Sequence, residues 1–304
     1  MTPRAAVRRV NVRGERPVTP APPDDHPAGI ARLAAELRVV RMVWRREMLH
    51  FVRDRARAVV SLLQPMLFLF VLGVGLARLF TDSGGAYGSG ADYLMFLFPG
   101  VLVMAAQVPA ISVGASIVWD RQSGFLREML VTPARRETLL IGKCLGGTTV
   151  ATCQGAVVLA TAGLVHIPYR TGLFALLLAE LALTSLALTA LGAMVAVTIR
   201  RIQTFNTVLT VLITPLIFLS GLMFPIKAMP SWMAALSLAN PLTYAVDVMR
   251  RTITACLPPR RGHALAEPVA WGSWHPSLPL EVAVVALFTV VALAVAGRRF
   301  ARTG

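Results

Sequence analysis

The sequence has little charge for its length. Only 15% of its 304 residues are Asp, Glu, Lys or Arg, whereas 56% are hydrophobic. A soluble domain contains roughly 25% charged residues, and here long stretches contain none. This shortage argues against an ordinary soluble protein and predicts an integral membrane protein.

Cysteine, histidine and catalytic motifs are also scarce. The three cysteines, Cys144, Cys153 and Cys256, have neither metal-site nor paired spacing, and the five histidines are scattered. No H-E-x-x-H or G-x-S-x-G motif is present, and Gly142-Lys143 is followed by Cys144 rather than by the Ser or Thr of a phosphate-binding loop. We therefore expect no catalytic, metal or cofactor site, and any energy from ATP must come from a separate protein.

Acidic residues are outnumbered two to one, since 30 basic residues face 15 acidic ones. Such an excess can indicate nucleic-acid binding. In a chain this apolar it indicates instead cytoplasmic loops that face anionic lipid and follow the positive-inside rule. Nearly all the basic residues are Arg, which suggests a GC-rich genome. We expect membrane lipids and no nucleic acid as partners, in the cytoplasmic membrane of a bacterium.

Six apolar segments are long enough to cross a hydrocarbon core of roughly 30 Å. Arg-rich stretches flank alternate ends of these segments, which predicts that both termini are cytoplasmic, although residues 225–279 on the other side also contain basic residues. The predicted spans are residues 58–79, 93–118, 144–167, 173–199, 205–224 and 280–296.

Two regions precede the first span. Residues 1–29 are rich in Pro and Arg and poor in apolar residues, which predicts a disordered cytoplasmic tail. Residues 30–57 have apolar side chains at steps of three and four with Arg between them. This pattern is typical of a basic amphipathic helix in the membrane interface, or of a soluble helix packed on a partner. Residues 58–304 would form the transmembrane domain.

Two further segments do not read as plain loops. Residues 122–132 have an apolar stripe that ends before Pro133, which suits docking on a partner protein or lying on the membrane surface. Residues 224–251 are amphipathic and interrupted by Pro225, Pro230 and Pro241. They predict short helices that enter the outer leaflet and turn back.

The stretches FLREMLVTPARRETLLIGK, FLSGLMFPIKAMPSWM and NPLTYAVDVMR resemble the ABC-2 type permeases of ATP-binding-cassette transporters, most closely the daunorubicin-resistance type that exports drugs and lipids. The resemblance covers about residues 38–300. It implies an all-α integral membrane fold of six transmembrane helices, like that of type V exporters. That fold has an N-terminal interfacial amphipathic helix, a cytoplasmic coupling helix and re-entrant outer helices.

The resemblance also implies partners and residue roles. Two permease copies, identical or related, would join ATPase subunits that bind ATP and Mg²⁺, and a hydrophobic substrate would pass between the permeases. The segment that would couple to the ATPase comprises Gly124, Phe125, Leu126, Arg127, Glu128, Met129 and Leu130.

Polar and hinge residues in or near the spans are candidates for the substrate path or for gating. Glu180 lies well inside a predicted span and should face a cavity or make a hydrogen bond within the bundle. Asp247 stands beside Arg250 and Arg251, where a local ion pair is the alternative to a gating role. The full set is Glu180, Phe224, Pro225, Asn240, Pro241, Tyr244 and Asp247.

Three functions fit these observations. The first is a permease subunit that exports a hydrophobic drug, lipid or lipid-linked substrate, with a separate ATPase as its energy source. The second is a membrane scaffold or sensor that couples to an ATPase without transport. The third is a membrane-embedded lipid-modifying enzyme, which the absence of convergent acids, histidines or a metal motif disfavours.

Overall fold

The computed structural model describes residues 29–75, 90–123, 136–257, 269–271 and 274–302. The predicted tail at residues 1–29 lies almost wholly outside these ranges. So do residues 124–135, which contain most of the predicted coupling helix.

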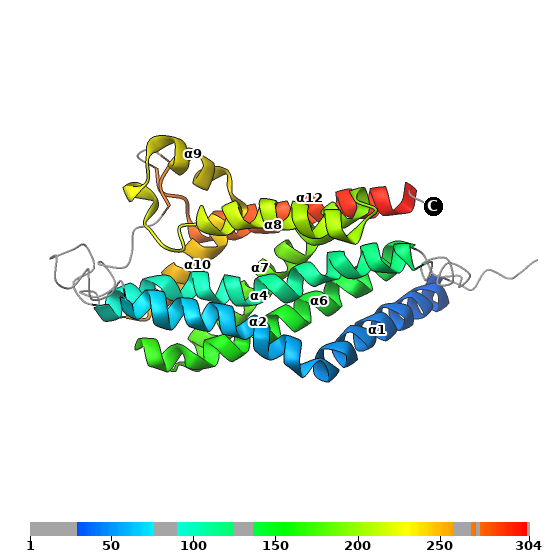
Figure 1. Ribbon diagram of the computed structural model, residues 1–304, viewed down its shortest axis with the longest axis horizontal. Helices are drawn as coiled ribbons and strands as arrows, with labels where there is room; N and C mark the ends of the chain where they lie inside the picture. Colours follow the sequence, from blue (N-terminus) through cyan, green and yellow to red (C-terminus); the bar gives the residue numbers. More distant parts are fainter. Residues whose placement is uncertain (1–28, 76–89, 124–135, 258–268, 272–273, 303–304) are drawn as a thin grey trace, which may run out of the picture.

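The described chain is an elongated bundle of helices (Figure 1). Its two ends differ. The short helices α9 (Ser231–Ala239) and α10 (Pro241–Ala255) gather at one end. Helix α1 (Gly29–Arg53) and the last turn of α12 (Leu278–Arg302) lie toward the other. We call these the α10 end and the α1 end.

Five helical segments in the described part are long and apolar enough to cross a membrane. They confirm the predicted multi-pass fold. The predicted fifth span corresponds to α8, Ile202–Phe218, which has only 17 residues. The five longer segments are α2 with the π-helical turn η1 (Arg55–Leu67 and Phe68–Gly73), α4 (Gly90–Gln122), α6 with η2 (Arg136–Leu159 and Ala160–Val165), α7 (Thr171–Thr198) and α12.

Helix α4 lies at the centre of the bundle. In its most apolar stretch 72% of the residues are buried, against 17% in the first span. Small residues let α4 approach its neighbours closely, because a Cβ added at Gly114 would lie 2.5 Å from the carbonyl oxygen of Gly192 on α7. The first span, by contrast, has most of its apolar surface on the outside, where lipid or another protein can cover it.

Helix α1 packs along α6. A Cβ added at Gly146 would lie 2.8 Å from Cβ of Glu47, and one at Gly142 would lie 3.0 Å from Cβ of Val43. The small residues spaced four apart on α6 therefore form the seat of α1. The predicted helix of residues 30–57 is in fact divided, because α1 ends at Arg53 and Asp54 caps the first turn of α2. Its position in a membrane interface remains a prediction.

Candidate functional site

Helix α10 is embedded in the bundle rather than lying on it. It packs against α4, α7 and α12, and eleven of its fifteen residues are buried. Asn240 fixes its start: the side-chain oxygen accepts a hydrogen bond from the Leu242 amide at 3.0 Å, and the side-chain nitrogen donates to the Leu216 carbonyl at 2.5 Å. Pro241 follows at the first helical position, where its missing N–H costs no hydrogen bond.

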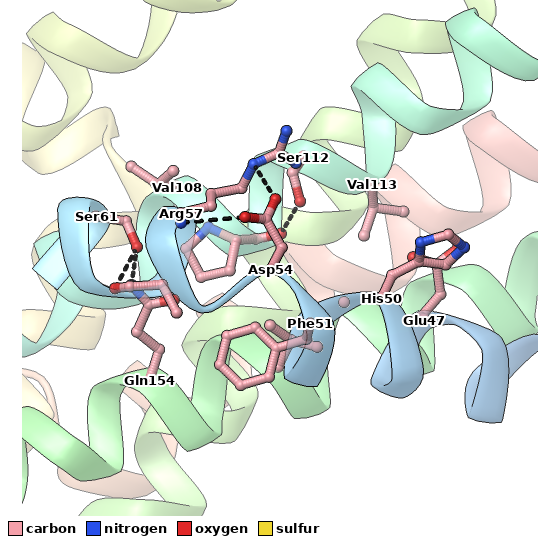
Figure 2. Close-up of a pocket in the computed structure, with 14 residues that line it drawn as sticks. Glu47, His50, Phe51, Asp54, Arg57, Ser61, Val108, Ser112, Val113 and Gln154 are labelled. Atoms are coloured by element: carbon pink, nitrogen blue, oxygen red, sulfur yellow. Dashed lines mark hydrogen bonds and ion pairs between the residues drawn. The ribbon is translucent and has the colours of Figure 1, made fainter.

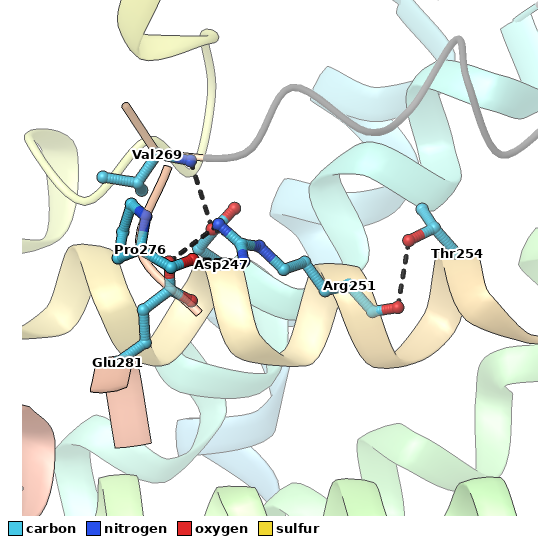
Figure 3. Close-up of polar contacts among 6 residues, drawn as sticks. All are labelled: Asp247, Arg251, Thr254, Val269, Pro276 and Glu281. Atoms are coloured by element: carbon cyan, nitrogen blue, oxygen red, sulfur yellow. Dashed lines mark hydrogen bonds and ion pairs between the residues drawn. The ribbon is translucent and has the colours of Figure 1, made fainter. Parts of the chain in front are cut away.

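Arg251 connects α10 to the segment that precedes α12 and to α12 itself (Figure 3). Its Nε donates to Asp247 Oδ2 at 2.9 Å, and its Nη2 donates to Glu281 Oε1 at 2.8 Å. Its Nη1 donates to the Pro276 carbonyl at 2.8 Å, and the Val269 amide also donates to Asp247 Oδ2, at 3.2 Å. The ion pair predicted for Asp247 is thus confirmed, with Arg251 as the partner. We call Asp247, Arg251 and Glu281 the α10 cluster.

Arg250, the neighbouring cation, points elsewhere. Its guanidinium carbon lies 3.8 Å from the centre of the Phe96 ring on α4, and its Nη2 donates to the Gly221 carbonyl at 2.9 Å. Burial strengthens both the cation–π contact and this hydrogen bond. Arg250 therefore ties α10 to α4 and to the turn after α8.

Tyr244 connects the start of α10 by hydrogen bonds to the segments before and after this helix. Its hydroxyl donates to the Leu238 carbonyl at 2.7 Å and accepts a hydrogen bond from the Trp271 indole at 3.0 Å. Burial raises the pKa of the Tyr244 phenol above its ordinary value, although the Trp271 hydrogen bond opposes this rise. The phenol is therefore neutral at physiological pH and can serve as both donor and acceptor.

Glu180 of α7 faces α10. Its Oε1 accepts a hydrogen bond from the Thr252 hydroxyl at 2.6 Å, so the predicted bond within the bundle is present. Glu180 also lines a groove of about 210 Å³ between α7, α10 and α12. The other lining residues are almost all apolar: Leu176, Ala179, Leu183, Thr184, Ala245, Val248, Val282 and Val285.

The predicted path residues thus fall into two groups. Asn240, Pro241, Tyr244 and Asp247 all lie on or cap α10, which Glu180 contacts through Thr252. Of the whole set, only Glu180 lines the groove. The remaining two belong to the segment before α9: Phe224 is 46% exposed, and Pro225 caps the short helix η3 (Ile226–Ala228). Their gating role remains a prediction, as does that of the first group.

The coupling residues Gly124 to Leu130 lie outside the described residues, but the helices on both sides of them are joined. Lys143 Nζ of α6 donates to Asp120 Oδ2 of α4 at 2.5 Å and to the Ser116 hydroxyl at 2.9 Å. Arg46 of α1 approaches Asp120 at 3.9 Å. We call Asp120, Lys143 and Arg46 the α1-end cluster. Sequence reasoning missed it, although Asp120 and Lys143 each stand at the edge of an apolar run.

A second cavity, of about 270 Å³, lies at the elbow between α1 and α2 (Figure 2). Glu47, His50 and Asp54 line it from the elbow, and Ser112 and Gln154 line it from α4 and α6. Gln154 donates a hydrogen bond to the Ser61 hydroxyl, which fixes α2 against α6. Acidic and basic side chains both line this cavity, through Glu47, Asp54 and Arg57.

Comparison with known proteins gives concordant matches. The model of the ABC-2 type transporter family matches residues 38–254. Nodulation protein J of Rhizobium leguminosarum bv. trifolii is 29% identical over 215 residues, which are 68% of this chain and 78% of that protein. Its counterpart in R. leguminosarum bv. viciae is 26% identical over 255 residues, 82% and 88% of the two chains. "Probable multidrug ABC transporter permease YbhR" of Escherichia coli (strain K12) is 28% identical over 167 residues, 54% and 45% of the two chains.

The helical bundle and these matches define a multi-pass membrane permease. The chain belongs to the ABC-2 type transporter family, because the family model covers well over half of it. It is therefore the membrane subunit of an ABC exporter and not its ATPase subunit. ATP binds to a partner ATPase. This agrees with the expectation from the sequence that any energy from ATP comes from a separate protein.

Proposed function

We propose that this chain is a daunorubicin-resistance-type permease that moves a hydrophobic drug, lipid or lipid-linked substrate out across the cytoplasmic membrane. In this proposal two permease copies assemble with ATP-binding-cassette ATPase subunits, and the substrate passes between the copies. Both termini face the cytoplasm, which agrees with the position of the start of α1 and the end of α12 at one end of the bundle (Figure 1).

The observation that carries the proposal is the Asp120–Lys143 pair. The predicted coupling segment connects the end of α4 at Gln122 to the start of α6 at Arg136. Because Asp120 and Lys143 join these two helices close to that segment, a push from the ATPase on the segment would move α4 and α6 together. Such a movement needs a free-energy difference between two states, which ATP binding to the partner supplies.

The first experiment is a pull-down of the tagged, detergent-solubilised permease from its native host, with ATPase activity measured on the eluate. A co-purifying ATP-binding-cassette subunit with orthovanadate-sensitive turnover is the expected result. A preparation without ATPase, under conditions that preserve a known transporter complex, would contradict the proposal. If the complex has ATPase activity but deletion of the permease gene changes neither drug nor lipid export, the scaffold or sensor function is favoured.

The coupling segment is tested with Phe125→Asp, Leu126→Asp and Met129→Asp combined. We expect at least a tenfold loss of export and of substrate-stimulated ATPase turnover, with normal insertion in the membrane, because the predicted docking stripe loses its apolar surface. Arg170→Asp is the control, since it introduces the same side chain at an exposed position before α7, outside the coupling segment. Normal export by the triple variant would disprove the coupling assignment.

A further inference from the structure

The cavity at the elbow between α1 and α2 has a charged rim and an apolar floor (Figure 2). Four ionisable side chains from the elbow form the rim: Glu47, His50, Asp54 and Arg57. Buried residues of α4 and α6 form the floor: Pro109, Val113, Gly147 and Val150. A ligand that fills this cavity therefore combines a polar group with an apolar part.

Two helices place this cavity at the edge of the hydrocarbon core. The first span begins at Arg55, directly after the elbow. Ser112 lines the cavity from α4 and follows the start of the second span, Asp92, by 20 residues, which is about 30 Å along the helix axis. A hydrocarbon core is roughly 30 Å thick. The cavity thus lies at the level of the lipid head groups in the leaflet nearer the α1 end.

Glu47 leaves one acidic group of the rim without a partner. Asp54 and Arg57 satisfy each other, because Arg57 Nε lies 3.1 Å from Asp54 Oδ2 and the Arg57 amide donates to Asp54 Oδ1 at 3.2 Å. Arg46, next to Glu47 in the chain, approaches Asp120 instead. Glu47 is half-buried and makes no ion pair or side-chain hydrogen bond with any residue that the structure describes. The cavity therefore lacks one cation that can donate hydrogen bonds.

We propose that this cavity binds a phospholipid whose head group carries a primary ammonium. The ammonium donates to the Glu47 carboxylate, and the phosphate accepts hydrogen bonds from Arg57 and His50. The Arg57 side chain is 75% exposed, so its Nη groups can turn toward a phosphate. An imidazole offers at least one N–H in either protonation state. The glycerol and the first acyl carbons then lie on the apolar floor.

The pattern of charge distinguishes this lipid from the other common head groups. A choline head group has the same charges, but its quaternary ammonium has no N–H to donate. A glycerol head group has hydroxyl donors but no positive charge, and its anionic phosphate would meet the acidic Glu47. Hydrogen bonds between charged partners are about twice as strong as neutral ones. An ethanolamine head group alone among the three supplies both the charge and the donors.

A lipid in this cavity would contact α1, α2, α4 and α6 together, because all four helices line it. It would hold the elbow at its angle and support the contact of α1 with α6. This role is independent of the proposed export function. Binding is measured without transport, so a failure of either proposal leaves the other standing.

The test is native mass spectrometry of the purified permease in detergent, with equimolar dioleoyl phosphatidylethanolamine, phosphatidylcholine and phosphatidylglycerol added. Their masses differ, so each bound lipid is identified directly. We expect the ethanolamine lipid to be retained about fivefold more than either competitor. Equal retention of the three lipids, or retention of none, would overturn the proposal. An excess of soluble glycerophosphoethanolamine should not displace the lipid, and displacement would show that the ligand is a free phosphoamine rather than a lipid.

Two variants assign the binding to the elbow. Glu47→Gln keeps the side-chain size and removes the charge, and we expect the preference for the ethanolamine lipid over the choline lipid to disappear. Ser112→Phe fills the cavity from an exposed position whose hydroxyl bonds only to the Pro109 carbonyl among the described residues. We expect it to abolish selective retention without lowering the unfolding temperature. Glu137→Gln, which changes an exposed acid on α6, is the control and should behave like the unsubstituted protein. An unchanged preference in either Glu47→Gln or Ser112→Phe would disprove the site.

Discussion

Each end of the bundle contains a cluster of three ionisable side chains, and the two clusters differ in their ratio of acidic to basic groups. The α10 cluster has two carboxylates, Asp247 and Glu281, for one guanidinium, Arg251. The α1-end cluster has one carboxylate, Asp120, for two cations, Lys143 and Arg46. The most exposed member of the first cluster is Arg251, at 18%, whereas Arg46 of the second is 36% exposed.

The clusters also join different sets of helices. The α1-end cluster joins α1, α4 and α6, and the α10 cluster joins α10 to the chain before α12 and to α12 itself. Helix α7 packs against members of both sets. Each cluster can be broken separately, so the comparison can be tested.

The largest effect should come from Arg251→Met. This change leaves Asp247 and Glu281, whose side chains are 2% and 0% exposed, without their shared cation. Removing one partner from a buried ionic cluster costs about 3–5 kcal/mol, so the variant should melt at a markedly lower temperature or fail to yield monodisperse protein. Thermal unfolding in nanodiscs measures this. A melting temperature equal to that of the unsubstituted protein would show that water already solvates both acids.

Lys143→Met should have a smaller effect at the opposite end. Asp120 loses its 2.5 Å partner, but Arg46 lies at 3.9 Å and can move closer. We expect the free energy of unfolding to fall by about 2 kcal/mol. Thermal unfolding in nanodiscs measures this change. The double variant Lys143→Met with Asp120→Leu should recover most of that stability, because it removes the buried charge together with its partner. A double variant less stable than the single one would contradict the pairing.

The smallest effect concerns the seat of α1. Gly146→Ala places a Cβ 2.8 Å from Cβ of Glu47, and we expect a loss of about 1 kcal/mol as α1 shifts away from α6. Gly297→Ala on α12 is the matched control: no heavy atom of the described residues, apart from those of its own helix backbone and chain neighbours, lies within 4 Å of the new Cβ. The helix should therefore become more stable by about 0.5–1 kcal/mol. Equal shifts in the unfolding temperatures of the two variants would show that α1 does not depend on this contact.

The spans could be predicted from the sequence because lipid imposes a simple pattern on it. Long apolar runs with few charges identify transmembrane helices whatever their neighbours are. The end of the fifth span was less predictable. Residues 205–224 contain no charged side chain, yet α8 ends at Phe218, and the chain turns at Gly221 with φ of +72°. Hydropathy does not distinguish an apolar turn covered by protein from an apolar helix covered by lipid.

The burial of α10 could not be predicted from the sequence. Polar and apolar residues are arranged along α10 in an amphipathic pattern. This pattern suits a helix at the membrane surface. The partners that satisfy them lie far away in the chain: Phe96 and Gly221 for Arg250, and Glu180 for Thr252. Only local pairs such as Asp247 with Arg251, four residues apart on one helix, can be read from spacing.

The contacts of Arg251 have a consequence for biosynthesis. Its partners at Pro276 and Glu281 follow it by 25 and 30 residues, so they leave the ribosome after it. Until the last span has been made, Arg251 has only Asp247 as an acidic partner from this cluster. Closure of the α10 end is therefore a late event in co-translational assembly. A pause in translation between residues 255 and 281 would prolong the period in which the core of the bundle is incomplete.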